Sequence, residues 1–236
     1  MNKIYLTLIT ILLSIHTNDN NEIANPSDYL NDIKTELKKE WPKNRTINLV
    51  FHGHSVPAGY FKTPIVNTLE SYPFQLLKEL KAIYPFAVIN IINSSIGGEN
   101  SLSGQKRFKS DVLIHKPDVL FIDYALNDLD VGLERSYKAW EEMIRKALKS
   151  KVKIILMTPS PDQRISFFET NNKLEQHKNQ IVQLAKENGV GLVDSYELFK
   201  EKVIAGDSIL KYMSQVNHPN EKGHQLIAKE ILKYFK

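Results

Sequence analysis

Cysteine is absent from this chain of 236 residues, and its absence narrows the chemistry open to the protein. No disulfide framework can form, and no thiolate is present to hold zinc or an iron–sulfur cluster. The apolar run at residues 4–15 is shorter than the about 20 residues that a transmembrane helix needs. The sequence also has no proline-, glycine- or serine-rich linker, no internal repeat and no low-complexity segment. These absences predict one domain with an ordinary hydrophobic core.

The first residues have the pattern of a secretory signal. Lys3 supplies a positive charge, residues 4–15 are apolar, and residues 16–22 are polar. We therefore predict that residues 1–20 are a signal peptide and that the protein is exported, to the periplasm or outside the cell. No cysteine follows the apolar run, so lipid attachment there is excluded, and no stable membrane insertion is expected once the signal is removed.

The charge pattern argues against nucleic acid as a partner. The formal net charge is +4, but basic residues alternate with acidic ones along the predicted helices and form no stripe. The seven histidines show no H-E-x-x-H or other close ligand spacing, so neither a metal site nor a cofactor is predicted. A phosphate-binding loop after the first strand is also disfavoured, because Pro57 has no N–H to donate.

Short apolar runs alternate with helical patterns along the chain. The apolar runs predict five strands, at residues 47–51, 87–92, 118–125, 153–157 and 190–193. Helical spacing of apolar residues predicts helices, at residues 27–40 (with Ser27 as N-cap), 72–84, 134–150, 171–188 and 220–235. Strands that alternate with helices form parallel sheets covered on both faces. The predicted fold is a single three-layer α/β/α domain over residues 21–236.

Four separate segments hold the parts that acyl transfer needs, which are a nucleophile, a base and donors for an oxyanion. They are residues 51–55 (FHGHS), 96–100 (IGGEN), 124–128 (YALND) and 217–220 (NHPN). Each lies at the carboxyl end of a predicted strand or in a loop before a helix. Ligands of open α/β sheets bind at that edge, so we expect the four segments to converge.

Three of the four segments also have a structural interpretation when taken alone. Ser55 has the position of a residue that caps the next helix, and Gly97-Gly98 has the composition of a turn. Asn127 can form an Asx turn after its strand, and Asp128 beside it is interpreted as structural. The combination of the four segments in order favours the catalytic interpretation.

Together these residues resemble the SGNH (GDSL-type) hydrolase family of esterases and lipases, from about residue 47 to the C-terminus. The resemblance implies a flavodoxin-like, five-stranded parallel sheet and no cofactor. It implies that Ser55 is the nucleophile and His218 the base. The oxyanion donors would be the N–H of Ser55, the N–H of Gly98 (with Gly97 as the alternate) and the side chain of Asn127.

Two positions depart from the family pattern. The aspartate that usually precedes the serine is replaced by His54, which is interpreted as a local structural residue or a substrate contact. The aspartate that usually lies three residues before the histidine is replaced by Gln215, which brings no charge. The histidine is then oriented by the amide of Gln215, by another carboxylate or by a backbone carbonyl, or else the enzyme works as a dyad; the sequence leaves all four open.

The resemblance implies a serine ester hydrolase that forms an acyl-enzyme, and by family analogy a carbohydrate O-acetyl esterase acting on an acylated small molecule or polysaccharide. Tyr60, just after the nucleophile, is predicted to contact substrate, with ordinary packing as the alternative. A lipase or thioesterase with the same machinery is one alternative function. A glycan-binding protein without activity is another, because both aspartates are missing.

Overall fold

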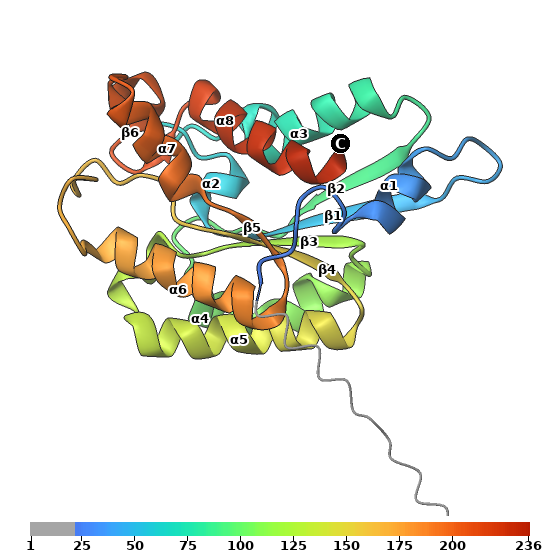
Figure 1. Cartoon of the computed structure of the whole chain (residues 1–236), viewed down its shortest axis with the longest axis horizontal. Coiled ribbons are helices and arrows are strands. Elements are labelled where there is room, and N and C mark those ends of the chain that lie inside the picture. The colour runs from blue at the N-terminus through green and yellow to red at the C-terminus, as the bar shows by residue number, and fades with distance from the viewer. Residues whose placement is uncertain (1–21) are drawn as a thin grey trace, which may run out of the picture.

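The computed structural model describes residues 22–236, which form a five-stranded parallel sheet between two layers of helices (Figure 1). The strands are β1 (Thr46–Gly53), β2 (Val88–Asn93), β3 (Val119–Asp123), β4 (Lys153–Met157) and β5 (Gly191–Val193). Their order in the sheet is β2-β1-β3-β4-β5, and every neighbouring pair is parallel. The predicted fold class is confirmed. The predicted signal peptide, residues 1–20, lies outside the described residues.

The central strands are apolar because both of their faces are covered. On β3, Val119 and Phe121 belong to one hydrophobic core, whereas Leu120 and Ile122 belong to the other. Successive side chains of a strand point to opposite faces, so one continuous apolar run supplies both cores. The edge strand β2 is only partly buried, in keeping with its place in the order.

Each face of the sheet has its own set of helices (Figure 1). One face is covered by α1 (Asn31–Leu37), α3 (Tyr72–Ile83), α7 (Ser195–Ile204) and α8 (Glu221–Leu232). The other is covered by α4 (Ser101–Asp111), α5 (Leu133–Lys149) and α6 (Lys173–Asn188). The 3₁₀ turns are η1 (Thr68–Glu70), η2 (Leu113–His115), η3 (Asn127–Asp130), η4 (Ile209–Lys211) and η5 (Lys233–Phe235).

All five predicted helices are present, with two corrections to their ends. The first begins at Asn31 after a turn, so its N-cap is Leu30 and the N-cap role predicted for Ser27 is wrong. The last ends at Leu232 and continues as the 3₁₀ turn η5. Helices α4 and α7 were not predicted. Within residues 22–236, no helix is both long and apolar enough to cross a membrane.

Two small elements complete the edge of the sheet at the carboxyl ends of the strands. The short helix α2 (Ser55–Ala58) follows β1 directly. The two-stranded ribbon of β6 (Met213–Gln215) and β7 (His218–Pro219) comes just before α8 and contacts α2 through β7. These elements bring the early and late segments of the chain together.

Candidate active site

Ser55 and His218 meet between α2 and β7. The Nε2 atom of His218 lies 2.9 Å from Oγ of Ser55, and the two residues are 6% and 7% exposed. Ser55 is the first residue of α2, whose N-cap is His54, so the serine hydroxyl is not used as a helix cap. A hydroxyl in contact with a nearly buried imidazole is the arrangement of a nucleophile and its general base.

The turn that presents Ser55 requires a glycine before it. A Cβ on Gly53 would collide with the carbonyl of Asp123 on the neighbouring strand, and it would come within 2.8 Å of Cγ of Pro57. The N–H of His54 donates to that same carbonyl at 3.2 Å. The chain therefore leaves β1 in close contact with β3, and this contact fixes where α2 begins.

His54 lies beneath the serine and is completely buried. Its Nδ1 accepts from the N–H of Val56 at 3.2 Å, and its Nε2 lies 3.4 Å from Oδ1 of Asp123. The hydroxyl of Tyr72 donates to the other oxygen of Asp123 at 3.0 Å. A substrate contact by His54 is incompatible with this burial, so that prediction is wrong. The local structural role, the alternative interpretation, describes its position.

The His218 ring is oriented from behind by the loop after α2. Its Nδ1 lies 2.9 Å from the carbonyl oxygen of Phe61 and 2.7 Å from Nε2 of Gln215. No carboxylate oxygen of residues 22–236 bonds to this ring. A proton on Nδ1 that is donated to Phe61 leaves Nε2 free to accept the serine proton, which is the tautomer a base needs. Of the alternatives left open by the sequence, the backbone carbonyl supports that tautomer.

Burial lowers the pKa of His218 below its ordinary value. The hydrogen bond to the Phe61 carbonyl opposes this effect, and the neighbouring His54 adds to it. A lowered pKa keeps the imidazole neutral, and therefore able to accept a proton, at neutral and mildly acidic pH.

The groups predicted to donate to an oxyanion come from three segments, which are the start of α2, the glycine turn and η3. Ser55 begins α2, so its N–H has no acceptor within the helix. Gly98 has a φ of 78°, and a Cβ placed on it would meet no atom within 4 Å, so the substrate side of this turn is open. Asn127 opens η3 and donates from Nδ2 to the Glu99 carbonyl at 2.8 Å, which leaves its second amide hydrogen for a ligand.

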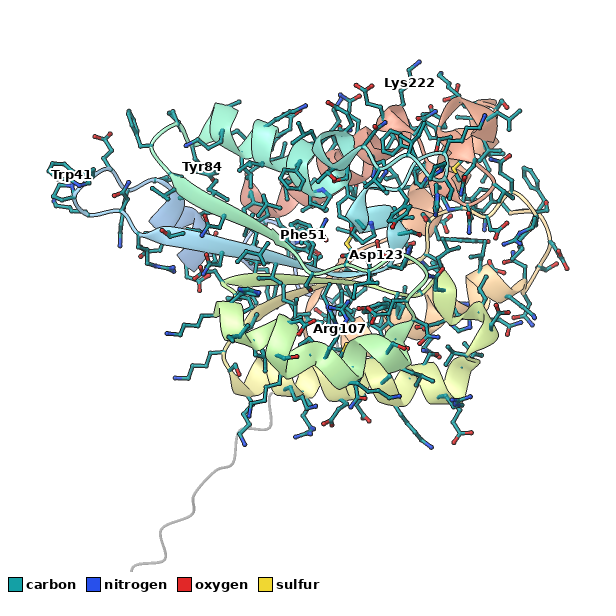
Figure 2. The ribbon with its side chains drawn as sticks, turned by 180° about the vertical axis from the view of Figure 1, so that it is seen from behind. Trp41, Phe51, Tyr84, Arg107, Asp123 and Lys222 are labelled. Carbon is teal, nitrogen blue, oxygen red and sulfur yellow. The ribbon has the colours of Figure 1, made fainter. Side chains whose placement is uncertain are left out.

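A charged cluster of Arg107, Glu99 and Tyr124 fixes the turn at Gly97-Gly98. This cluster was not predicted from the sequence. Arg107 of α4 forms a bidentate pair with Glu99, and the hydroxyl of Tyr124 donates to Glu99 at 2.9 Å. The hydroxyl of Tyr124 also lies 3.2 Å from Nε2 of His52, a residue of β1. His52 is fully buried, and this burial lowers its pKa to about 4. Figure 2 shows Arg107 on the face of the sheet that α4 and α5 cover, and Asp123 at the end of β3. In the sequence, only the spacing of Glu99 and Arg107, eight residues apart, pointed to this pair.

Asp128 has the structural role that was expected of it. It is fully buried and accepts from the N–H of Ser101 at 2.9 Å and from Nε1 of Trp140 at 2.7 Å. These bonds join the start of α4 and the middle of α5 to the segment that carries Asn127.

A cavity of about 490 Å³ opens beside the donors. Its wall contains Gly98, Asn127 and Asn217 together with charged residues, among them Arg164 and Lys173. On the other side of the site, Tyr60 is half-buried, with its ring against Gly97 and its centroid 6.2 Å from that of His218. The wall of the cavity that includes Gly98 and Asn127 is therefore largely polar and charged, and an aromatic ring lies beside the histidine. Residues 22–236 contain no group of three histidine or carboxylate side chains placed to hold a metal ion.

Comparison with curated proteins gives two relatives. An acetylxylan esterase of Geobacillus stearothermophilus is 25% identical over 166 residues, which cover 65% of this chain and 75% of that protein. An uncharacterized lipoprotein of Bacillus subtilis (strain 168) is 33% identical over 81 residues, covering 31% of this chain and 33% of the lipoprotein.

Solved structures share the fold. The crystal structure of an acetylxylan esterase from Geobacillus stearothermophilus superposes with a TM-score of 0.70 at 23% identity, covering 80% of this chain and 94% of that one. A two-domain esterase active on acetylated mannans gives a TM-score of 0.72 at 24% identity, covering 92% of this chain and 55% of that one. A model of the GDSL-like lipase/acylhydrolase family matches residues 51–226, a range that contains all four segments of the site. The chain therefore belongs to the GDSL-like lipase/acylhydrolase family, and it is a serine ester hydrolase by class.

Proposed function

We propose that this protein removes short acyl groups, acetyl above all, from a carbohydrate by way of an acyl-enzyme on Ser55. The observation that carries the proposal is the 2.9 Å contact between Ser55 Oγ and His218 Nε2, with the Phe61 carbonyl 2.9 Å behind the same ring. A buried serine held against a neutral histidine can be deprotonated as it attacks.

The first half of the reaction forms the acyl-enzyme. Oγ of Ser55 attacks the ester carbonyl carbon while Nε2 of His218 takes the hydroxyl proton. The oxyanion receives hydrogen bonds from the N–H groups of Ser55 and Gly98 and from Nδ2 of Asn127. Loss of one such donor typically costs about 10² to 10³ in rate. His218 then gives its proton to the departing alcohol as the carbon–oxygen bond breaks.

The second half returns the enzyme to its starting state. Water gives a proton to Nε2 of His218 and attacks the acyl carbon, passing through the same oxyanion site. Collapse of this intermediate releases the carboxylic acid and returns the proton to Ser55. No cofactor takes part in either half.

The polar cavity favours a carbohydrate alcohol over a long acyl chain. Its wall includes the side chains of Asn100, Asn217, Arg164 and Lys173, which can bond to sugar hydroxyls, whereas an alkyl chain gains nothing from them. Tyr60 lies beside the histidine, where its ring can lie against a sugar ring. Relatives named for action on acetylated xylan and on acetylated mannans support the same substrate class.

We also propose that the protein acts after export. Residues 1–20 have the pattern of a secretory signal, which directs a protein out of the cytoplasm. Similarity over 81 residues to a lipoprotein supports export.

The test is hydrolysis of p-nitrophenyl acetate and release of acetate from acetylated xylan and mannan oligosaccharides, with the Ser55→Ala and His218→Ala variants alongside. We expect turnover by the parent protein and a loss of at least about 10³-fold in each variant. Faster cleavage of long-chain esters than of acetate would indicate a lipase or thioesterase. Glycan binding without turnover, unchanged in Ser55→Ala, would overturn the proposal in favour of a binding protein.

A further inference from the structure

Gln215 holds its side-chain amide in a defined orientation. The backbone N–H of Thr63 lies 3.0 Å from one end of the amide, and an N–H can only donate. That end is therefore the oxygen, Oε1. The nitrogen, Nε2, must then be the atom 2.7 Å from Nδ1 of His218.

The two neighbours of His218 Nδ1 favour opposite protonation states of that atom. The Phe61 carbonyl, at 2.9 Å, can only accept, so it favours a proton on Nδ1. The Gln215 nitrogen can only donate, so it favours a bare Nδ1, and the ring proton then lies on Nε2, facing Ser55. A neutral imidazole has one proton, and it satisfies only one of these partners at a time.

We propose that Gln215 is a positioning residue that stabilises the unproductive tautomer of His218 and so limits the rate of the hydrolase. With the proton on Nε2, the ring cannot take the proton of Ser55, and only the fraction of molecules protonated on Nδ1 can react. This inference rests on the proposed function, and it reverses the role that an aspartate has at this position in the family pattern, which is to select the productive tautomer.

The contacts that set the tautomer both come from one exposed loop. Phe61 supplies the accepting carbonyl, and Thr63 supplies the N–H that holds the amide of Gln215. The loop is closed by bonds from the N–H of Phe61 to the Ile65 carbonyl (3.1 Å) and from the N–H of Ile65 to the Lys62 carbonyl (2.8 Å). The amide is thus fixed by backbone groups of a closed loop, which prevents it from simply turning its oxygen toward the ring.

Two nearly isosteric substitutions separate the possible roles of this side chain. In Gln215→Glu, one carboxylate oxygen accepts from Thr63 and the other accepts from Nδ1, so no atom has to move. We expect kcat to rise at least tenfold, since loss of the corresponding acid in well-studied triads costs about 10⁴. In Gln215→Met, the competing donor disappears without a new acceptor, and kcat is expected to rise up to about fivefold, the equivalent of one neutral hydrogen bond.

The Gln163→Glu variant is the control for the effect of added negative charge on kcat. Gln163 is exposed and donates from Nε2 to the backbone carbonyl of Gln215 at 3.1 Å. A carboxylate cannot donate this bond and turns to solvent, so the variant adds a negative charge near Gln215 without reaching the ring. Its kcat is expected to stay within about twofold of the parent. The carboxylate of Gln215→Glu, by contrast, favours the charged imidazolium and should move the acid limb of the kcat/KM profile to higher pH.

¹⁵N NMR of the His218 ring gives a readout that needs no turnover. The parent protein should show substantial protonation of Nε2, and Gln215→Glu should show protonation of Nδ1 only. A parent ring protonated only on Nδ1, together with lower kcat in Gln215→Met, would overturn the inference. Failure of the proposed function would appear separately, as a parent protein without Ser55-dependent esterase activity, and the NMR ratio would still decide the tautomer.

Discussion

At the scale of single residues, His54 replaces an aspartate without reaching substrate. It caps α2 through Nδ1, and it places Nε2 next to Asp123, which also receives the hydroxyl of Tyr72. The imidazole therefore supplies the acceptor that an aspartate would supply to the helix, and it also spans the distance to β3. Loss of the ring leaves the helix end without its cap and removes a completely buried side chain that lies against the carboxylate of Asp123.

We expect His54→Ala to lower the free energy of unfolding by about 2 to 4 kcal/mol, from the lost cap and the cavity that the buried ring leaves. His54→Asn retains an acceptor for the N–H of Val56 and should recover about 1 kcal/mol of that loss. Urea unfolding of the three proteins gives the comparison. Equal stability of the Ala and Asn variants would show that capping is not part of the role of His54.

The site residues that act through their side chains could be predicted from the sequence, because their residue type shows what they can do. Ser55 and Asn127 were identifiable because they follow strands whose ends meet at one edge of the sheet, and His218 because it lies just before the last helix. Phe61 was not, because its contribution is a backbone carbonyl, which every residue has. The replacement at Gln215 was visible, but the direction of its amide depends on the N–H of Thr63, a contact between residues far apart in the chain.

The pH dependence of activity follows from the burial of His218. Its pKa lies below the ordinary 6.5, chiefly because burial disfavours the charged ring. The base must be neutral to act, so kcat/KM should rise with pH through a midpoint below 6.5 and stay high above it. The check is the kcat/KM profile with p-nitrophenyl acetate from about pH 4.5 to about pH 8. A midpoint above 6.5 contradicts this account of the histidine.

At the scale of elements, α4 was not predicted because its own sequence favours a helix only weakly. Residues 101–111 (SLSGQKRFKSD) bury one large apolar side chain, Phe108, and include Gly104. The glycine is needed, since a Cβ there would collide with the ring of Tyr124. The helix is fixed instead by the Asn100 cap and by Asp128. The signal for α7, Asp194 followed three residues later by Glu197, was present and was missed.

The position of the glycine turn depends on α4 through Arg107. Lysine cannot reproduce the bidentate contact with Glu99, whose carbonyl accepts from Asn127. We expect Arg107→Lys to lower kcat/KM about 10- to 100-fold through displacement of the oxyanion donors. Arg145→Lys is the matched control, because Arg145 pairs with Glu142 on the exposed surface of α5. Full activity in a folded Arg107→Lys variant would show that the pair of Arg107 and Glu99 does not position the oxyanion donors.

At the scale of the whole molecule, the arrangement of the two cores was the most predictable feature. The buried runs on β1, β3 and β4 supply alternate residues to opposite faces, and periodicity alone indicates this. Other buried groups were not predictable, among them three histidines from separate elements. They are His52 on β1, His177 on α6 and His224 on α8, each at most 3% exposed.

Burial of these three histidines makes the fold sensitive to acid. Desolvation lowers the pKa of His52 and His177 to about 4 and that of His224 to about 3, against 6.5 for the exposed side chain. Between these values the unfolded chain binds protons that the folded protein does not, so stability is complete above pH 6.5 and falls as the pH drops toward 4. Each group accounts for up to about 1.4 kcal/mol per pH unit in that window.

His177 offers the clearest test, because its Nδ1 has no hydrogen-bond partner among residues 22–236. The free energy of unfolding should fall between about pH 7.5 and about pH 5, and His177→Leu should reduce that fall by about 2 kcal/mol. His115→Gln removes an exposed histidine and should leave the fall unchanged. Urea unfolding at the two pH values measures all three proteins. An identical fall in the parent and in His177→Leu would contradict this account, because it would mean that burial of the His177 imidazole does not contribute to acid sensitivity.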